Sequence, residues 1–141
     1  MSPAVIFALL SAFFASLVAI FAKIGIKDVD TNLAVAIRTL VIVFFAWGIV
    51  LIQGNAMDAL KIPRYTMVFL VLSAVATGLS WLFYYHALQL GDVSNVAPID
   101  KLSIALTILL AFVFLGEAPT VGNITGGILV TLGVLATVFI K

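Results

Sequence analysis

The sequence predicts an all-α membrane protein, a bundle of five transmembrane helices, from its composition, its apolar runs and the breaks between them. Hydrophobic residues make up 65% of the 141 residues and charged residues only 9%, whereas soluble domains carry roughly half and roughly a quarter. Six acids and seven bases cannot cover the surface of a soluble domain of this length. A bilayer removes that requirement, because lipid tails solvate apolar side chains.

Five apolar runs have the length of a spanning helix, which needs about 20 mostly apolar residues. Open strands in lipid would leave backbone groups without hydrogen bonds, so helix is the assignment that suits a bilayer. The predicted helices cover residues 3–22, 33–52, 66–88, 93–115 and 121–140, and all belong to one transmembrane domain over residues 1–141.

Short breaks separate the runs, so consecutive helices should be antiparallel neighbours. Residues 27–32 are the only strongly polar stretch between the first two runs. Gly54 can end the second helix and Pro63 can open the third, while Gly91 and residues 116–120 mark the later breaks. The first run lacks a positively charged leader and is longer than the core of a signal peptide, about 7–15 residues, so we expect a retained helix.

Several classes of function do not fit these residues. The net charge of +1 provides no basic surface for nucleic acid. The absence of cysteine excludes disulfide and thiolate chemistry, and His86 as a lone histidine makes a poor metal site. The sequence contains no motif of a hydrolase, a metalloprotease or a nucleotide-binding loop. We therefore expect no enzyme activity, no cofactor, no metal and no nucleic-acid partner.

An odd number of helices places the two termini on opposite sides of the membrane, but the orientation is undecided. Lysine and arginine favour the cytoplasmic side. One side holds Lys61 and Arg64, and the other holds Lys23, Lys27 and Lys141, with Arg38 and Lys101 deeper in their helices. This weak bias allows either one fixed orientation or insertion both ways round, which gives an antiparallel homodimer. Many transporters contain two inverted repeats around a site near the midplane, and this chain fits one half of such an inverted-repeat transporter fold.

Short motifs in a fixed order point to one family. They are FAKIG at 21–25, AIR at 36–38, ALQLG at 87–91, APIDK at 97–101 and FLGE at 114–117, followed by a glycine-rich final helix. This arrangement resembles the EamA-type repeat of the drug/metabolite transporter superfamily over nearly the whole chain. Larger members carry two such repeats, which gives about ten helices in inverted halves.

The resemblance implies export or exchange of small metabolites or drugs, and we expect a multi-pass protein of a prokaryotic cytoplasmic (inner) membrane. The chain departs from the small multidrug resistance branch of the superfamily, whose members have four helices and an acidic residue inside the first. Residues 3–22 contain no acid. We therefore do not expect this chain to share the proton-coupled export of cations of that branch.

Charged residues inside the apolar runs are the first candidates for function, because each costs about 2.5–3.5 kcal/mol in the membrane. The antiparallel arrangement places Arg38, His86, Asp100 and Lys101 toward the same side. Arg38 lies roughly 9 Å into its run at 1.5 Å per residue, and Asp100 lies at a similar depth, so the two can form a pair. Neighbours on a continuous helix point different ways, so Asp100 and Lys101 are each expected to have a separate partner. We predict that Arg38, Asp100 and Lys101 form a charged gate, with snorkelling cations and a helix-start carboxylate as the structural alternatives.

Polar residues at helical spacing form a stripe on each of two helices. The third helix carries Ser73, Thr77, Ser80 and Tyr84, and the fourth carries Asp100, Ser103 and Thr107. Stripes on two adjacent helices favour a wet cavity wall over simple polar contacts between helices, worth about 0.6 kcal/mol each. Trp81, Tyr84 and Tyr85 either line the same pocket or belong to the aromatic belt at the membrane interface. The predicted substrate path thus includes Thr77, Ser80, Trp81, Tyr84, His86, Ser103 and Thr107, although a hydrogen-bonded structural histidine explains His86 more simply.

The last helix carries small residues that let membrane helices approach closely. They are Gly122, Gly126, Gly127 and Gly133, and they predict either a contact inside the bundle or the seam of a homodimer. Glu117 follows the glycine of its turn and is expected to be solvated or to support that turn.

Together these features predict a secondary transporter that works in the lipid bilayer as an antiparallel homodimer with alternating access. Its small-molecule substrate is not named by the sequence. The alternative is a non-transporting accessory or scaffolding membrane subunit. The two hypotheses differ in whether the polar stripes face one water-accessible cavity.

Overall fold

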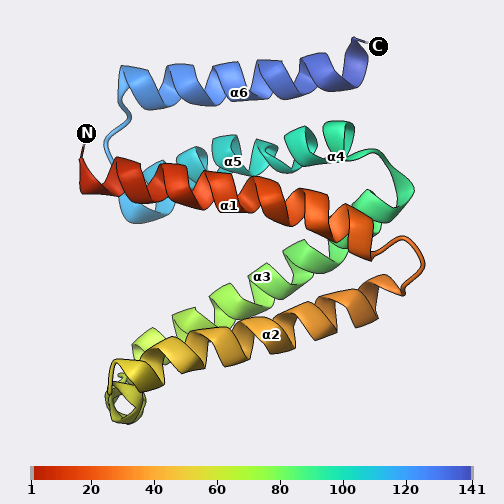
Figure 1. The fold of residues 1–141 in the computed structure, drawn as a ribbon. Helices are drawn as coiled ribbons and strands as arrows, with labels where there is room; N and C mark the ends of the chain where they lie inside the picture. Colours follow the sequence, from red (N-terminus) through yellow and green to blue (C-terminus); the bar gives the residue numbers. More distant parts are fainter. Residues whose placement is uncertain (1, 141) are drawn as a thin grey trace. The chain divides into compact units, whose positions relative to one another are not determined.

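The computed structural model describes residues 2–140 and contains five helical spans long and apolar enough to cross a membrane. The described residues form no strand, so the predicted fold class is confirmed. Figure 1 shows the order of the elements along the chain. They are α1 (Pro3–Gly25), α2 (Thr31–Ile52), the 3-10 helix η1 (Ala56–Lys61), α3 (Arg64–Leu90), α4 (Val93–Asp100), α5 (Leu102–Leu110), the π-helical turn η2 (Ala111–Leu115) and α6 (Val121–Phe139).

Most large apolar side chains of these helices are exposed on the chain. In water this surface would be unfavourable, because every exposed apolar side chain would lose the free energy of burial. In a bilayer it is the surface that contacts lipid, and the helices satisfy their own backbone groups. The chain is therefore an integral membrane protein.

The described residues divide into two compact units, residues 20–89 and residues 2–19 with 90–140. The first unit holds the end of α1, all of α2 and η1, and nearly all of α3. The second holds most of α1 together with α4, α5, η2 and α6.

A small core in the 20–89 unit joins the end of α1 to α2 and the end of α3. Ile26 and Leu88 are 2% and 0% exposed, and Ala22, Val35 and Tyr85 are also buried. Because few side chains are buried in this unit, polar contacts at the helix ends carry much of the tertiary specificity.

Two polar side chains tie the end of α1 and the turn that follows it to the end of α3. The Gln89 side-chain amide donates hydrogen bonds to the carbonyls of Ile26, at 3.2 Å, and Val29, at 2.9 Å. The Lys23 ammonium donates to the carbonyl of Leu88. These contacts occupy backbone carbonyls that the ends of helices leave without intrahelical partners.

Local capping explains where the helices begin and end. The Asp30 carboxylate accepts a hydrogen bond from the Leu33 backbone N–H at 3.0 Å, so α2 begins at Thr31, two residues before the predicted start. Gly54, with φ of 74°, follows the end of α2, and Pro63 precedes α3 as predicted. The Thr120 hydroxyl caps α6 by accepting from the Asn123 N–H at 3.1 Å.

In the second unit, α6 packs against α4 and α5. Gly127 and Val134 are the buried residues of α6. η2 ends at Gly116, whose φ of 66° belongs to the left-handed region, and the Glu117 N–H reaches back to the carbonyl of Ala111 at 3.4 Å. This is the backbone pattern of a glycine-terminated helix end. The Glu117 residue itself is exposed, in keeping with its prediction as a solvated turn residue.

Replacement of Gln89 by Leu should lower the free energy of unfolding in detergent by about 1–3 kcal/mol, because two hydrogen bonds between α3 and the α1–α2 turn are lost. A sodium dodecyl sulfate titration followed by circular dichroism measures this. Gln53→Leu is the matched control, since Gln53 is an exposed residue directly after α2. Equal effects of the two substitutions would contradict the role given to Gln89.

Candidate functional site

The fourth span is interrupted at Lys101, inside a region predicted as one continuous helix. The backbone tightens there to hydrogen bonds three residues apart, from the Lys101 N–H to the Pro98 carbonyl at 2.9 Å and from the Ile104 N–H to the Lys101 carbonyl at 3.0 Å. Pro98 lies inside α4 and has no N–H, so the helical hydrogen bond to the Ser94 carbonyl is also missing. The span Val93–Leu115 is thus built from α4, α5 and η2.

The interruption brings Asp100 and Lys101 together. The Lys101 Nζ lies 3.0 Å from Asp100 Oδ2, and the two side chains are 52% and 33% exposed. The expectation of separate partners for these neighbours was therefore wrong. That expectation assumed a continuous helix, whereas Lys101 lies at the junction between two helices, where adjacent side chains can turn toward each other.

A second charged group lies between α2 and α3. The Arg38 guanidinium carbon is 4.0 Å from the centroid of the Trp81 ring and 5.5 Å from that of Tyr85. Trp81 and Tyr85 are one helical turn apart on α3, so they present adjacent rings to the same cation. A desolvated cation–π contact of this kind contributes about 2 kcal/mol. Arg38 is thus held by an aromatic surface rather than left to extend freely along the helix.

The Arg38 charge has no carboxylate partner within the described residues of its unit. The acids of residues 20–89 are Asp28, Asp30 and Asp58. Asp30 caps α2, and Asp58 pairs with Lys61 at 2.7 Å. None of the three lies within ion-pair distance of Arg38. The predicted Arg38–Asp100 pair would join the two units, and it stays a prediction.

The remaining residues of the predicted path are placed as follows. The Thr77 hydroxyl donates to the Ser73 carbonyl at 2.8 Å, so it is satisfied within α3. Ser80 and His86 are exposed on α3, Tyr84 is partly buried beside Tyr85, and Ser103 and Thr107 are exposed on α5. No hydrogen bond to the His86 side chain occurs within the described residues, which does not support the interpretation of His86 as a structural histidine. Among the same residues no group of three or more His, Cys, Asp or Glu could hold a metal ion.

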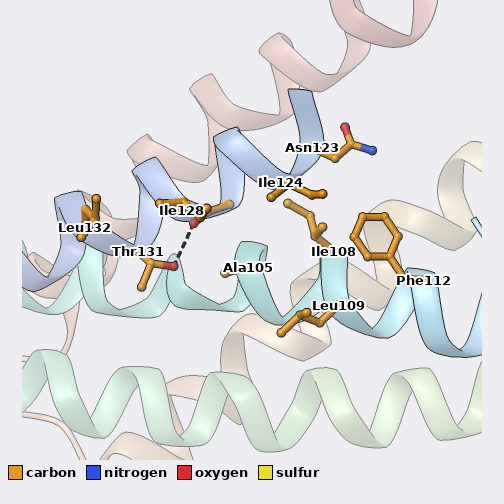
Figure 2. A pocket seen from close by; sticks show the side chains of 10 residues that line it. Ala105, Ile108, Leu109, Phe112, Asn123, Ile124, Ile128, Thr131 and Leu132 are labelled. Carbon is orange, nitrogen blue, oxygen red and sulfur yellow. Dashed lines mark hydrogen bonds between the residues drawn. The ribbon is translucent and has the colours of Figure 1, made fainter. Parts of the chain in front are cut away.

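An apolar hollow of about 290 Å³ lies between α5–η2 and α6 (Figure 2). Asn123 and Thr131 are its polar members, and the Thr131 hydroxyl donates to the Gly127 carbonyl at 2.8 Å. The other residues of the lining are Ala105, Ile108, Leu109, Phe112, Ile124, Gly127, Ile128 and Leu132. Asp100, Ser103 and Thr107 are not among them, so this hollow is distinct from the predicted polar path.

The glycines of α6 fall into two groups. A Cβ on Gly127 would lie 3.5 Å from Ile108 Cδ1, so this glycine is in contact with α5. Around Gly126 and Gly133 nothing lies within 4 Å of such a Cβ, and Gly122 faces only its own cap, Thr120 Oγ1, at 3.9 Å. The helical spacing places Gly122, Gly126 and Gly133 along one stripe of α6, apart from the Gly127 face.

Five apolar spans define this chain as an integral membrane protein, and comparison with known proteins identifies its family. The chain belongs to the EamA-like transporter family, which matches residues 2–139. It is 44% identical over 128 residues to a Sinorhizobium protein named "Uncharacterized transporter in cobO 3'region", with 91% of each chain covered. It is 27% identical over 100 residues to an uncharacterized protein of Methanocaldococcus jannaschii, covering 64% of this chain and 73% of that protein. No solved structure matches the chain.

Sequence reasoning missed the contacts that organise the 20–89 unit. It named Trp81 and Arg38 separately but did not join them, and it did not single out Lys23 or Gln89 as links between helices. The spacing of Trp81 and Tyr85, four residues apart, was the available signal for an aromatic surface on one face of the third helix. No pattern in the sequence indicates which backbone carbonyls a lysine or glutamine will reach.

Gly127→Leu should destabilise the fold by about 1–3 kcal/mol, because the Cβ would already touch Ile108 and the rest of the leucine side chain would crowd the α5–α6 contact. Gly133→Leu is the matched control on the same helix and should cost less than about 0.5 kcal/mol, because no atom of the described residues lies within 4 Å of a Cβ at that position. Both are compared by denaturant titration of the monomer in detergent. A larger cost at Gly133 than at Gly127 would contradict this division of the glycines.

Proposed function

We propose that the chain is a secondary transporter of small organic metabolites or drugs, working in a prokaryotic cytoplasmic membrane as an antiparallel homodimer with alternating access. The observation that carries the proposal is the interruption of the fourth span at Asp100 and Lys101. It lies roughly 10 Å along the span at 1.5 Å per residue, well inside a hydrocarbon core of about 30 Å.

Charges at such a depth need a reason, because each costs about 2.5–3.5 kcal/mol on insertion scales. The ion pair offsets part of that cost, and the two side chains stay partly exposed rather than being packed away. Interrupted helices of this kind line solute and ion sites in transporters, where freed backbone carbonyls and helix ends face a cavity. A chain that only filled space in a membrane assembly would have no need of this interruption.

The proposed homodimer would supply the second half of the transporter fold, which a single chain lacks. Five spans correspond to one half of an inverted-repeat transporter, and the weak lysine and arginine bias permits both orientations. An inverted partner would supply a second interrupted span at the opposite face. Alternate opening of the two Asp100–Lys101 pairs would then give alternating access with a single kind of subunit.

Flux into proteoliposomes tests the transport proposal directly. Three labelled probes cover the charge classes of small organic solutes: benzoate as an anion, tryptophan as a zwitterion and tetraphenylphosphonium as a cation. Saturable flux of at least one probe, absent from empty liposomes, is expected. If none shows saturable flux with correctly folded protein, the accessory-subunit alternative is favoured.

Asp100→Asn should reduce that flux by about tenfold or more, equivalent to about 1.4 kcal/mol, because the gate loses its ion pair. Folding and dimerisation are checked first by circular dichroism and size-exclusion chromatography. Asp92→Asn is the matched control, since Asp92 is exposed and precedes α4. Unaltered flux and unaltered pH dependence in Asp100→Asn would leave Asp100 with a structural role alone.

Lys27→Cys should be labelled by an impermeant maleimide from both faces of the membrane, because half of the copies are expected in each orientation. The native chain has no cysteine, so the introduced thiol is unique. Lys61→Cys, near the other end of α2, should also be labelled from both faces. Labelling of residue 27 from one face only and of residue 61 from the other face only would exclude the antiparallel arrangement.

A further inference from the structure

The Arg38 guanidinium lies inside the α2 span and is held there by aromatic rings alone within the described part of the 20–89 unit. It is half-buried on α2, and within the described residues of this unit it neither pairs with a carboxylate nor donates a hydrogen bond. Asp100, its predicted partner, is paired with Lys101 in the other unit. An arginine inside a membrane span normally compensates its charge with a partner or with backbone carbonyls.

The aromatic rings hold Arg38 without consuming its hydrogen-bonding capacity. Trp81, 4.0 Å away, and Tyr85, 5.5 Å away, interact with the cation through their π faces. These faces accept no conventional hydrogen bond from a guanidinium, which has five N–H donors in a rigid fork. Tyr85 is 5% exposed and fixed in the core, so the aromatic surface is a firm support. The donors are thus positioned but unsatisfied.

The charges near this group favour an anion. Lys23 reaches the end of α3 and donates to Leu88, one turn beyond Tyr85, which adds a second positive charge to this end of the unit. Asp28 and Asp30 belong to the turn between α1 and α2, outside the spans, and Asp30 is engaged as the cap of α2. Lys61, Arg64 and Asp58 belong to the opposite end of α2 and α3.

We propose that Arg38, supported by Trp81 and Tyr85, binds the carboxylate or phosphate group of the transported solute, so that the substrates are small organic anions. The fork of the guanidinium matches the two oxygens of such a group, and a lysine at this position would not. The Trp81 ring, which stays partly exposed beside the cation, provides an apolar surface for a planar body attached to the anion. This inference rests on the proposed transport function and assigns its substrate class.

A lipid headgroup offers the same phosphate chemistry as a soluble anion. The side chain of Arg38 is long enough to extend toward the headgroups at the membrane interface. The experiment therefore separates the two sources. It uses the tryptophan under the cation as the reporter. The chain has two tryptophans, Trp47 and Trp81, and Trp47 is exposed on α2, so Trp47→Phe leaves Trp81 as the single tryptophan, which is excited selectively over the three tyrosines.

Benzoate, in lipid-free non-ionic detergent, should change the emission of Trp81 in the full-length Trp47→Phe protein in a saturable manner. Benzamide and benzylamine have the same ring without the negative charge and should give no saturable change. Arg38→Gln should weaken benzoate binding by about tenfold or more, as expected for the loss of a charge-assisted hydrogen-bonded pair. Arg64→Gln is the control, since Arg64 is exposed at the start of α3.

The outcomes decide the inference in either direction. Equal responses to benzoate and benzamide would overturn it without any substitution at Arg38, which keeps the test valid if Arg38→Gln fails to fold. Arg38→Lys keeps the charge but not the fork, and unchanged benzoate affinity in this variant would overturn the role of the guanidinium. If phosphatidylglycerol added to the detergent reproduces the emission change and blocks benzoate, the group is a lipid headgroup and the substrate assignment falls.

This result is separable from the transport proposal. Saturable flux of tryptophan or tetraphenylphosphonium without benzoate binding would overturn the substrate class and leave the transporter intact. Benzoate binding without flux of any probe would instead overturn the transport function on which the inference rests.

Discussion

A polar group in the hydrocarbon of a bilayer has no water to hydrogen-bond with, so it needs a hydrogen-bond partner within the protein. This constraint shapes every part of the chain. The backbone meets it by forming helices along each span. Side-chain hydroxyls meet it locally, as where Thr77 and Thr131 donate to the carbonyls of Ser73 and Gly127 one turn earlier. The ends of the helices meet it through longer side chains, with Lys23 and Gln89 reaching carbonyls that a helix leaves open. Because few apolar side chains are buried within the chain, these polar contacts give the fold much of its specificity.

Two sites in the chain do not fully satisfy this need for hydrogen-bond partners, and both consist of charged residues. At Lys101 the fourth span departs from helical geometry, and an ion pair forms between sequence neighbours inside an apolar segment. At Arg38 a cation rests on aromatic rings with its donors unsatisfied within the described part of its unit. Each feature costs stability in lipid, and each becomes understandable if it meets a solute or an ion during transport.

The surface of α6 shows how one helix can serve two kinds of contact. Gly127 lets α6 approach α5, where a side chain would meet Ile108. Among the described residues, no atom lies within 4 Å of a Cβ placed on Gly126 or Gly133, and one on Gly122 would meet only Thr120 Oγ1. The apolar hollow lies on the Gly127 face of the helix, apart from this stripe. Helix association in membranes relies on packing and on hydrogen bonds rather than on expulsion of water. A smooth glycine surface is therefore compatible with close approach of a second helix, including one from another copy of the chain.

The sequence by itself determined the class of the protein and the number of its spans, because a run of about 20 apolar residues leaves lipid as the suitable solvent and helix as the suitable backbone. It also determined which residues were costly to place there, such as Arg38, Asp100 and Lys101, and the motif order that led to the EamA-like family. Only the tertiary structure decided how those charges are compensated. The Asp100–Lys101 pair depends on a break in the fourth helix at Lys101, which the presence of Pro98 was not enough to predict. The Arg38 contact depends on α2 and α3 packing together at Trp81. Spacing along the sequence determines which residues share a face of one helix. The partners that a residue finds on another helix depend on how the helices pack, and the sequence of one helix does not determine that.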